Sequence, residues 1–296
     1  MKICIIITTY NRKQYLRKLL IQLYQQHIDN MIILDIIVVV DGSTDGTLEM
    51  LKMEFSDVNI IKGDGNWWYT KSINEGFKYA IKLNADYVLT LNDDVEIAHD
   101  YLKQILNVVL ISKNVSIIGS ISLTVSDPKL IVSSGNVLVN KCLRRYQPYL
   151  PLLSVVNPVE LRGIYPSVTL PGRGMLIPVF ILKKIKLFDE KFKQYHSDGD
   201  FTLRALRAGY KVYVLWDAKL YVHLEQTSSS TSFLNNSYRV LFKSFFNPVS
   251  RNYLPAVLRF MWRHGSKYCY PLRIILFFLA SFINVMKKGN KWGKLN

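Results

Sequence analysis

Acidic residues are in short supply in this sequence of 296 residues, and the shortage is concentrated at one end. The formal net charge is +16, and no Asp or Glu follows Glu225. Residues 231–296 contain eleven Lys or Arg and so supply +11 of that charge, while the rest of the chain has an ordinary balance. The C-terminal stretch is therefore expected to meet an anionic partner.

Features that define several protein classes are also missing. The three cysteines, Cys4, Cys142 and Cys269, are widely spaced and form no CxxC pair. This predicts neither a disulfide framework nor a structural zinc site and is typical of a reducing cytosol. The apolar run near the start is too short for a signal peptide. No GxGxxG or GxxxxGKS/T motif occurs, so neither a dinucleotide-binding fold nor a P-loop is indicated.

What is present is an alternation of strand-like and helix-like segments. Residues 2–9 and 32–40 are β-branched apolar runs, and the segment between them has apolar residues at the 3.6-residue spacing of a helix with one buried face. Strands apolar on both faces and separated by amphipathic helices predict an α/β protein with a mostly parallel sheet flanked by helices. Further strands are expected at 58–62, 86–91 and between 115 and 180, a helix from Asp198 to Gly209, and aromatic-rich helices in the tail.

Each of the first four predicted strands ends in polar residues. In parallel sheets, ligands bind at the carboxyl ends of the strands near a switch in strand order, so we expect these residues to gather at one edge. They are Thr9, Tyr10 and Asn11 after the first strand, Asp41 after the second, Asp64 after the third, and Asp93 and Asp94 after the fourth.

Asp93 and Asp94, in the stretch LTLNDDVEI, have two interpretations. An Asp here could cap the helix expected from about His99 to Ser112. Alternatively, two adjacent like charges could form a site for a cation. Alone, the pair favours the cap; the other strand-end residues at the same edge favour the cation site, with capping as a secondary duty of the turn.

Each of the later motifs could have a role in binding or catalysis, and each also has a purely structural interpretation. GDGNWWYTKSINEGF at 63–77 could stack a Trp on a base or sugar, or bury it. In LPGRGMLIP at 170–178, Arg173 could reach a phosphate from between two glycines, or the segment could be a hairpin bulge. HSDGDF at 196–201 offers two carboxylates at a helix start, one to cap and one to act as a general base. His223 could ligate a metal or simply pack.

Seven short motifs follow one another along the chain, namely TTYNR, VVDGSTDGT, GDGN, LNDDV, GRGM, DGDF with its following LRALRAGY, and a late VH. In this order they resemble the motifs of the family 2 glycosyltransferases with the GT-A fold. The similarity is strongest to bacterial enzymes that build surface polysaccharides, and it spans about residues 3 to 230. It implies a GT-A, Rossmann-like sheet with a C-terminal helical appendage.

The resemblance also implies residue roles. Asp198 would be the catalytic base, with Ser197 standing where the family usually has Glu, and Asp94 and His223 would hold Mg²⁺ or Mn²⁺. Asn92 stands where many members have the first Asp of the metal motif. The nucleotide-sugar side would be formed by Thr9, Tyr10, Asn11, Arg12, Asp41, Asp64, Asn66, Trp67, Asn74, Asp93, Arg173 and Gly174.

The implied reaction is a single displacement that inverts the anomeric centre. The metal would neutralise the diphosphate leaving group, and Asp198 would take the proton from an acceptor hydroxyl as its oxygen attacks C1. We therefore predict a metal-dependent, inverting hexosyl- or deoxyhexosyltransferase that moves a sugar from a nucleotide sugar to a glycan acceptor. A nucleotidyltransferase on a similar sheet is one alternative, although TTYNR offers it only Arg12. A catalytically silent membrane-surface protein is the other, and it leaves Asp94 and Asp198 unexplained.

The apolar stretch of the tail, between Arg273 and Lys287, has about thirteen residues, fewer than the roughly twenty of a spanning helix. It is typical of an interfacial helix on an anionic inner leaflet, which suits a lipid-linked acceptor and a cytoplasmic, peripheral membrane location. The alternative is a helix packed on the catalytic domain. No nucleic-acid module occurs, so no nucleic-acid partner is expected. The predicted domains are 1–230, with a nucleotide part at 1–95 and a catalytic part at 96–230, and a tail at 231–296.

Overall fold

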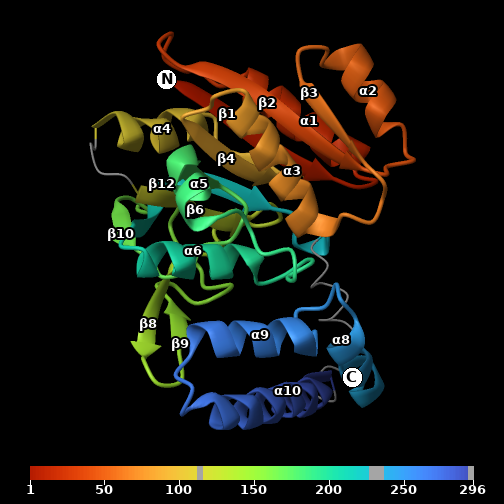
Figure 1. Cartoon of the computed structure of the whole chain (residues 1–296), viewed down its shortest axis with the longest axis vertical. Helices are drawn as coiled ribbons and strands as arrows, with labels where there is room; N and C mark the ends of the chain where they lie inside the picture. The colour runs from red at the N-terminus through yellow and green to blue at the C-terminus, as the bar shows by residue number, and fades with distance from the viewer. Residues whose placement is uncertain (112–115, 227–236, 293–296) are drawn as a thin grey trace.

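The computed structural model describes residues 1–111, 116–226 and 237–292. These residues form a central mixed sheet of ten strands (Figure 1). The strand order is β10-β12-β6-β11-β4-β1-β2-β3, with β5 paired to β12 and β7 to β6. The neighbours β4, β1, β2 and β3 are parallel, as predicted, and β11 lies antiparallel between β4 and β6. The strands are β1 (Lys2–Thr9), β2 (Ile33–Asp41), β3 (Asn59–Gly63), β4 (Tyr87–Asn92), β5 (Val95–Ile97), β6 (Ser116–Thr124), β7 (Ile131–Ser133), β10 (Ile164–Pro166), β11 (Met175–Pro178) and β12 (Lys211–Val222).

Helices cover both faces of this sheet. Because side chains alternate along a strand, Ile3, Ile5 and Ile7 of β1 pack in the core on one face, and Cys4 and Ile6 pack in the core on the other. All five are fully buried, which confirms the predicted α/β sheet with strands apolar on both faces. One face carries α1 (Lys13–Tyr24), α2 (Thr47–Glu54) and α4 (Tyr101–Ile111); the other carries α3 (Trp68–Lys82), α5 (Val179–Ile185) and α6 (Ser197–Arg207).

The short strand β5 changes the interpretation of the acidic pair. Asp93 and Asp94 form the turn between β4 and β5, and α4 begins only at Tyr101. They therefore do not cap that helix, and the prediction of a secondary capping duty is wrong. Three residues of VEI are too few to show a strand period in the sequence. The side chain of Asp100 lies at the start of α4 instead, where its Oδ2 accepts a hydrogen bond from Gln104 at 2.8 Å.

Below the sheet, the described C-terminal residues form α8 (Tyr238–Phe246), α9 (Leu254–His264) and α10 (Tyr270–Trp292), an arrangement visible in Figure 1. The helix α9 lies beneath α6, and α10 lies on the side of α9 away from the sheet. Arg259 of α9 pairs with Asp189 at 2.6 Å. The predicted helical appendage is thus present, and its α9 packs on the sheet domain. The predicted boundary at residues 230 and 231 lies outside the described residues.

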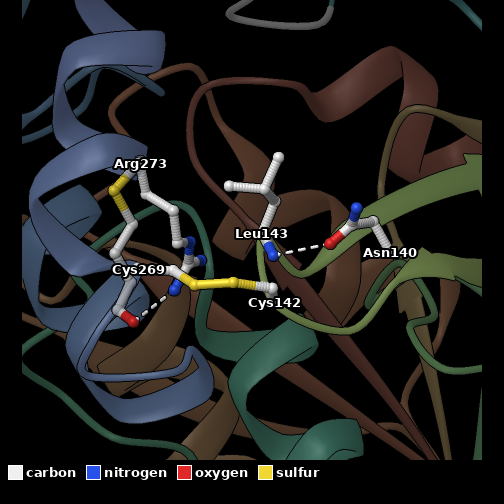
Figure 2. Close-up of a disulfide and its surroundings, with 6 residues drawn as sticks. Asn140, Cys142, Leu143, Cys269 and Arg273 are labelled. Carbon is white, nitrogen blue, oxygen red and sulfur yellow. Dashed lines mark hydrogen bonds between the residues drawn. A yellow bond between two sulfur atoms is a disulfide. The ribbon is translucent and has the colours of Figure 1, made fainter.

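A hairpin of β8 (Asn136–Asn140) and β9 (Arg145–Pro148) points from the sheet domain toward the appendage (Figure 1). A disulfide between Cys142 and Cys269 ties its tip to the start of α10 (Figure 2). The Cα atoms are 6.1 Å apart, within the normal range for a disulfide. The prediction of no disulfide is therefore wrong, because the two cysteines are 127 positions apart in the sequence and only the fold brings them together. Cys4 stays a thiol, and burial raises its pKa to about 11.

Among the helices that the structure describes, none combines the length and the apolar character needed to cross a membrane.

Candidate active site

A cleft of about 400 Å³ lies at the carboxyl edge of the parallel strands. It is placed where the ends of β1 and β4 meet the segment before β11 and the N-terminus of α6. Four of the predicted site residues, Arg12, Asp94, Arg173 and Asp198, line it. The fold thus gathers charged side chains from four separate motifs in one cavity.

Arg12 links the two acids at the end of β4. Its Nη1 donates to Asp93 Oδ1 at 2.9 Å and to Asp94 Oδ2 at 3.1 Å. Both carboxylates are only 3% exposed. Burial raises the pKa of Asp93 to about 6, with Arg12 opposing the rise and Asp94 adding to it. The cation that two adjacent acids require is therefore supplied here by the protein itself.

Asp94 keeps one oxygen suited to a metal ion. Its Oδ1 is buried and has no hydrogen-bond partner among the described residues, and the same holds for Asn92 Oδ1. Both residues line the cleft. Such oxygens suit Mg²⁺ or Mn²⁺, and Mg²⁺ is commonly held by one or two carboxylates together with substrate phosphates. No group of three or more His, Cys, Asp or Glu in the described chain could hold a metal, so substrate oxygens would have to complete the coordination.

His223 does not line the cleft, although its backbone N–H donates to the Asp94 carbonyl at 3.2 Å. Its Nε2 lies 2.9 Å from Glu96 Oε1, and its Nδ1 lies 2.9 Å from Glu225 Oε1. Both ring nitrogens are therefore engaged by carboxylates. A metal contact by His223 requires the ring to leave these two partners.

The two acids of HSDGDF face different parts of the protein. Asp198 faces the cleft, where its Oδ2 accepts the Gly172 N–H at 2.9 Å and its Oδ1 accepts the Gly199 N–H at 2.8 Å. The neighbouring Ser197 is fully buried, and its hydroxyl accepts a hydrogen bond from Thr70 at 2.9 Å. Asp198 is thus oriented by two backbone N–H groups. The family usually has a Glu just before this Asp, and here that position is Ser197.

Asp200 is fully buried and serves the contact with α9. Arg204, Arg263 and His264 each lie 2.8 Å from its oxygens. Burial alone would raise its pKa, but these hydrogen bonds and charges hold the pKa of Asp200 well below its usual range. Asp198 is therefore the carboxylate of this motif that a substrate can reach.

The glycines around Arg173 allow close packing at the cleft. A Cβ on Gly172 would collide with the Tyr69 hydroxyl, and Gly174 has φ +73° with the side chains of Leu220 and Ser120 close by. Burial lowers the pKa of Arg173, while the charge of Asp94 raises it. Its Nε is buried and has no hydrogen-bond partner within the described chain. The loop thus holds a guanidinium with an unused donor inside the cleft.

The other predicted nucleotide-side residues lie outside the cleft lining. Asp41 holds the turn after β3, because its Oδ1 accepts the Gly65 N–H at 2.8 Å and its Oδ2 accepts the N–H groups of Trp67 and Trp68, each at 3.0 Å. That turn also contains Asp64, whose Oδ1 accepts the Asn66 N–H at 2.8 Å. Asp41 thus supports this turn through backbone hydrogen bonds.

The loop after β1 is similarly organised. Asn11 has φ +51°, and its side chain accepts the Thr44 N–H at 2.7 Å, which joins this loop to the one after β2. Thr9 is 4% exposed, whereas Tyr10 is 57% exposed. Trp67 is half-buried and has the Lys71 ammonium 4.9 Å above its ring.

Asn74 lies away from these groups. It is 2% exposed, and its Nδ2 donates to Phe188 O at 2.9 Å and to Glu190 at 3.0 Å. Its Oδ1 accepts the Phe188 N–H at 3.0 Å. Asn74 therefore joins α3 to the segment before α6, and its nucleotide contact stays a prediction.

The motifs missed several residues of the cleft. Tyr69, Gln194, Tyr195 and Arg251 line it, together with residues 133–136 of the opposite wall. Arg251 comes from the connection between α8 and α9, and its guanidinium lies 5.2 Å from the Tyr195 ring centre. Nothing in the local sequence marks Arg251, because its position depends on how the appendage docks.

A family model described as glycosyl transferase family 2 matches residues 4–156. The chain belongs to this family. The match includes the segments that carry Arg12, Asp41 and Asp94, while Arg173 and Asp198 of this family 2 protein lie beyond it. No curated protein matches the chain in sequence.

Solved structures similar to this family 2 chain include TarS of S. aureus. A crystal structure of TarS gives a TM-score of 0.54 at 20% identity, covering 96% of this chain and 48% of the TarS chain. TarS 1–349 in complex with UDP-GlcNAc gives 0.54 at 20% identity, covering 96% and 79%, and the complex with UDP gives 0.52 at 20%, covering 89% and 72%. The chain thus spans about half the length of TarS, and the similarity confirms the predicted GT-A fold.

Proposed function

We propose that this family 2 glycosyltransferase moves a sugar from a nucleoside diphosphate sugar to a hydroxyl group of a glycan acceptor, with inversion at the anomeric carbon. The observation that carries the proposal is the pair of acids in one cleft with different surroundings. Asp94 lies beside the guanidinium of Arg12, whereas Asp198 is held by backbone N–H groups. Such a division suits a leaving group on one side and a proton acceptor on the other.

On the donor side, Arg12 and Arg173 would bind the diphosphate oxygens, since guanidinium groups match phosphate geometry. Their charges would stabilise the negative charge that grows on the diphosphate as the bond to C1 breaks. Asp94 would hold Mg²⁺ or Mn²⁺, which when bound supplies further positive charge for this leaving group.

On the acceptor side, Asp198 would accept the proton of the attacking hydroxyl while its oxygen forms the bond to C1. The Gly172 N–H fixes the carboxylate at 2.9 Å and so sets the direction from which the proton is taken. In this proposal the donor side comes mainly from residues 1–95, and the base comes from 96–230.

A nucleotide-sugar binding screen tests the proposal. Because TarS binds UDP-GlcNAc, UDP sugars come first in the panel, followed by dTDP and GDP sugars, each with Mn²⁺. A bound donor raises the melting temperature by mass action, and the nucleotide sugar that binds should then yield free nucleoside diphosphate as its sugar passes to an acceptor hydroxyl or to water. Stabilisation by nucleoside triphosphates alone, with release of pyrophosphate, would instead favour a nucleotidyltransferase. If the protein bound neither nucleotide sugars nor nucleoside triphosphates, both proposed enzyme activities would be contradicted. A catalytically silent binding protein would then be favoured.

We also propose that the appendage lies on the anionic inner face of the cell membrane, where a lipid-linked acceptor would be delivered. Contiguous exposed apolar surface usually marks an interface, and the tail contains no acid to repel anionic lipid. The large apolar side chains that α8 and α10 expose include Tyr238, Phe242, Phe246, Leu272, Ile275, Leu279, Phe282 and Met286.

Vesicle flotation tests this location. Leu279→Glu places a charge on the exposed face of α10 and should reduce binding to phosphatidylglycerol vesicles several-fold. Met53→Glu, at a residue 84% exposed on α2, is the matched control and should bind like the wild type. Equal flotation of the two variants would contradict the proposed surface.

A further inference from the structure

Three arginines meet where the β8–β9 hairpin touches the appendage, outside the cleft. Arg144 lies in the turn at the hairpin tip, Arg207 ends α6, and Arg273 lies near the start of α10. The disulfide between Cys142 and Cys269 holds the tip against α10, and Figure 2 shows the Arg273 side chain beside it. Arg207 and Arg273 both donate to backbone carbonyls of α9, so the disulfide fixes the hairpin tip that carries Arg144 close to both of them.

The phenol of Tyr146, on β9, lies among these three guanidinium groups. Burial raises its pKa, and the charges of Arg144, Arg273 and Arg207 all oppose that rise. Its hydroxyl is buried and has no hydrogen-bond partner within the described residues. Because buried hydroxyls normally find a partner, this one indicates a place for a further group.

Within the described residues, no Asp or Glu forms an ion pair with Arg144, Arg207 or Arg273. Arg144 Nε is also buried without a hydrogen-bond partner in the part of the chain that the structure describes. Burial lowers the pKa of Arg207 and of Arg273, and the nearby charge of Arg144 lowers both further. The acid that acts on Arg207 is Asp200, whose oxygens are already engaged by Arg204, Arg263 and His264. An anion would offset this uncompensated charge.

Helix ends explain only part of the cluster. Arg207 donates to Arg263 O at 2.8 Å and Arg273 donates to Met261 O, both near the C-terminus of α9, where the helix dipole favours cations. Arg144 adopts φ +49° in the hairpin turn, and its buried Nε has no hydrogen-bond partner among the described residues. The positions of Arg144 and Tyr146 therefore require another reason.

We propose that Arg144, Tyr146, Arg207 and Arg273 form a binding site for a phosphate group. Guanidinium groups bind phosphate oxygens through short, charge-assisted hydrogen bonds, and the Tyr146 hydroxyl can donate one more. The phosphate could belong to a phospholipid headgroup, since α10 carries the proposed membrane surface, or to a soluble phosphate ester. No residue of this site lines the cleft, so its test is independent of the proposed transfer reaction.

Inorganic phosphate and vesicles test this site on the full chain. The variants are Arg144→Gln and Tyr146→Phe, with Arg145→Gln as the matched control, because Arg145 is the exposed neighbour in the same hairpin. Phosphate should raise the melting temperature of the wild type and the control more than NaCl of equal ionic strength. Arg144→Gln should weaken phosphate binding by about tenfold or more.

The outcomes distinguish the two sources. Selective stabilisation by inorganic phosphate, lost in Arg144→Gln, would show that a soluble phosphate suffices. No effect of phosphate, but weaker flotation of Arg144→Gln than of Arg145→Gln with phosphatidylglycerol vesicles, would assign the site to a headgroup. Equal behaviour of these two variants in both assays would overturn the proposal. Nucleotide-sugar binding should be the same in all of them, so a failed donor screen would not be mistaken for a failed phosphate site.

Discussion

At the scale of single residues, Asp93 and Asp94 show how a buried strand can end in two acids. The guanidinium of Arg12 bonds to both, which compensates part of the repulsion between them. The compensation is incomplete, because burial still raises the pKa of Asp93 to about 6. The end of β4 is therefore a place where some stability is given up for a charged site.

Asp93→Asn should stabilise the protein at pH 7. The folded protein binds a proton at Asp93 more readily than the unfolded chain, whose Asp pKa is near 3.8, so this carboxylate lowers the free energy of unfolding as the pH rises from about 4 to 6. The variant should gain roughly 1–3 kcal/mol at neutral pH and lose that pH dependence. Urea denaturation between pH 4 and 7 measures both effects. If the free energy of unfolding changed with pH equally in the wild type and the variant, the raised pKa of Asp93 would be contradicted.

Asp94→Asn should abolish turnover and weaken the metal-dependent binding of nucleotide. The change removes the negative charge beside the unused Oδ1, which is the oxygen proposed to bind the metal. Calorimetric titration of nucleotide with and without Mn²⁺ measures the loss. Full activity of the wild type in EDTA would show that no metal takes part.

The predicted site residues differ in how far the sequence could predict their positions and surroundings. Arg12, Asp94 and Asp198 were predictable, because strand ends and a helix start mark them locally. The surroundings of Asn74 and His223 were not, since their partners Glu190 and Glu96 belong to distant segments. A motif identifies a side chain, but its hydrogen bonds depend on which segments pack around it.

At the scale of elements, α6 explains why its two acids have different roles. Successive residues of a helix are turned by about 100°, so residues two apart point to nearly opposite sides. Asp198 therefore faces the cleft while Asp200 faces α9. The sheet pattern was predicted well because its strands are long and apolar, whereas β5 was missed because it has three residues.

Asp200→Asn should lower the stability of the protein by about 3–5 kcal/mol at pH 7, because it leaves the buried contacts with Arg263 and His264 without their negative charge. In the wild type, the depressed pKa of Asp200 gives stability that is present above about pH 4 and is lost as the pH falls below it. Thermal unfolding from pH 2 to 7 should show a larger loss of stability in acid for the wild type than for the variant, in which Asp189 and Glu96 still have lowered pKa values. The same loss in the variant would mean that other groups cause it.

The disulfide joins the hairpin to α10, and a variant without it should be less stable than the wild type in its oxidised form. Cys142→Ser frees a chain segment closed over a separation of 127 residues and should lower the free energy of unfolding by roughly 2–4 kcal/mol. Denaturation with and without dithiothreitol measures this difference. The reductant should affect the wild type and leave the variant unchanged, and an unaffected wild type would exclude a stabilising bond.

At the scale of the whole molecule, the sheet domain and the appendage together form the candidate active site. The α8–α9 connection brings Arg251 to the cleft, while α9 is held to the sheet domain by Asp189 and Asp200. The sequence predicted a helical tail but not this contact, because docking depends on acids of the first domain that lie far away in the sequence. The appendage thus connects the cleft to the proposed membrane surface.

Asp198→Asn, compared with the exposed control Asp57→Asn, tests most directly whether the cleft performs glycosyl transfer. The measurement is the release of nucleoside diphosphate as the sugar passes from the bound nucleotide sugar to an acceptor hydroxyl or to water, alongside the affinity for that nucleotide sugar. Asp198→Asn should bind it with wild-type affinity and release the product at least about 100-fold more slowly, whereas Asp57→Asn should match the wild type in both. Release by Asp198→Asn at a near-wild-type rate would contradict its role as the base.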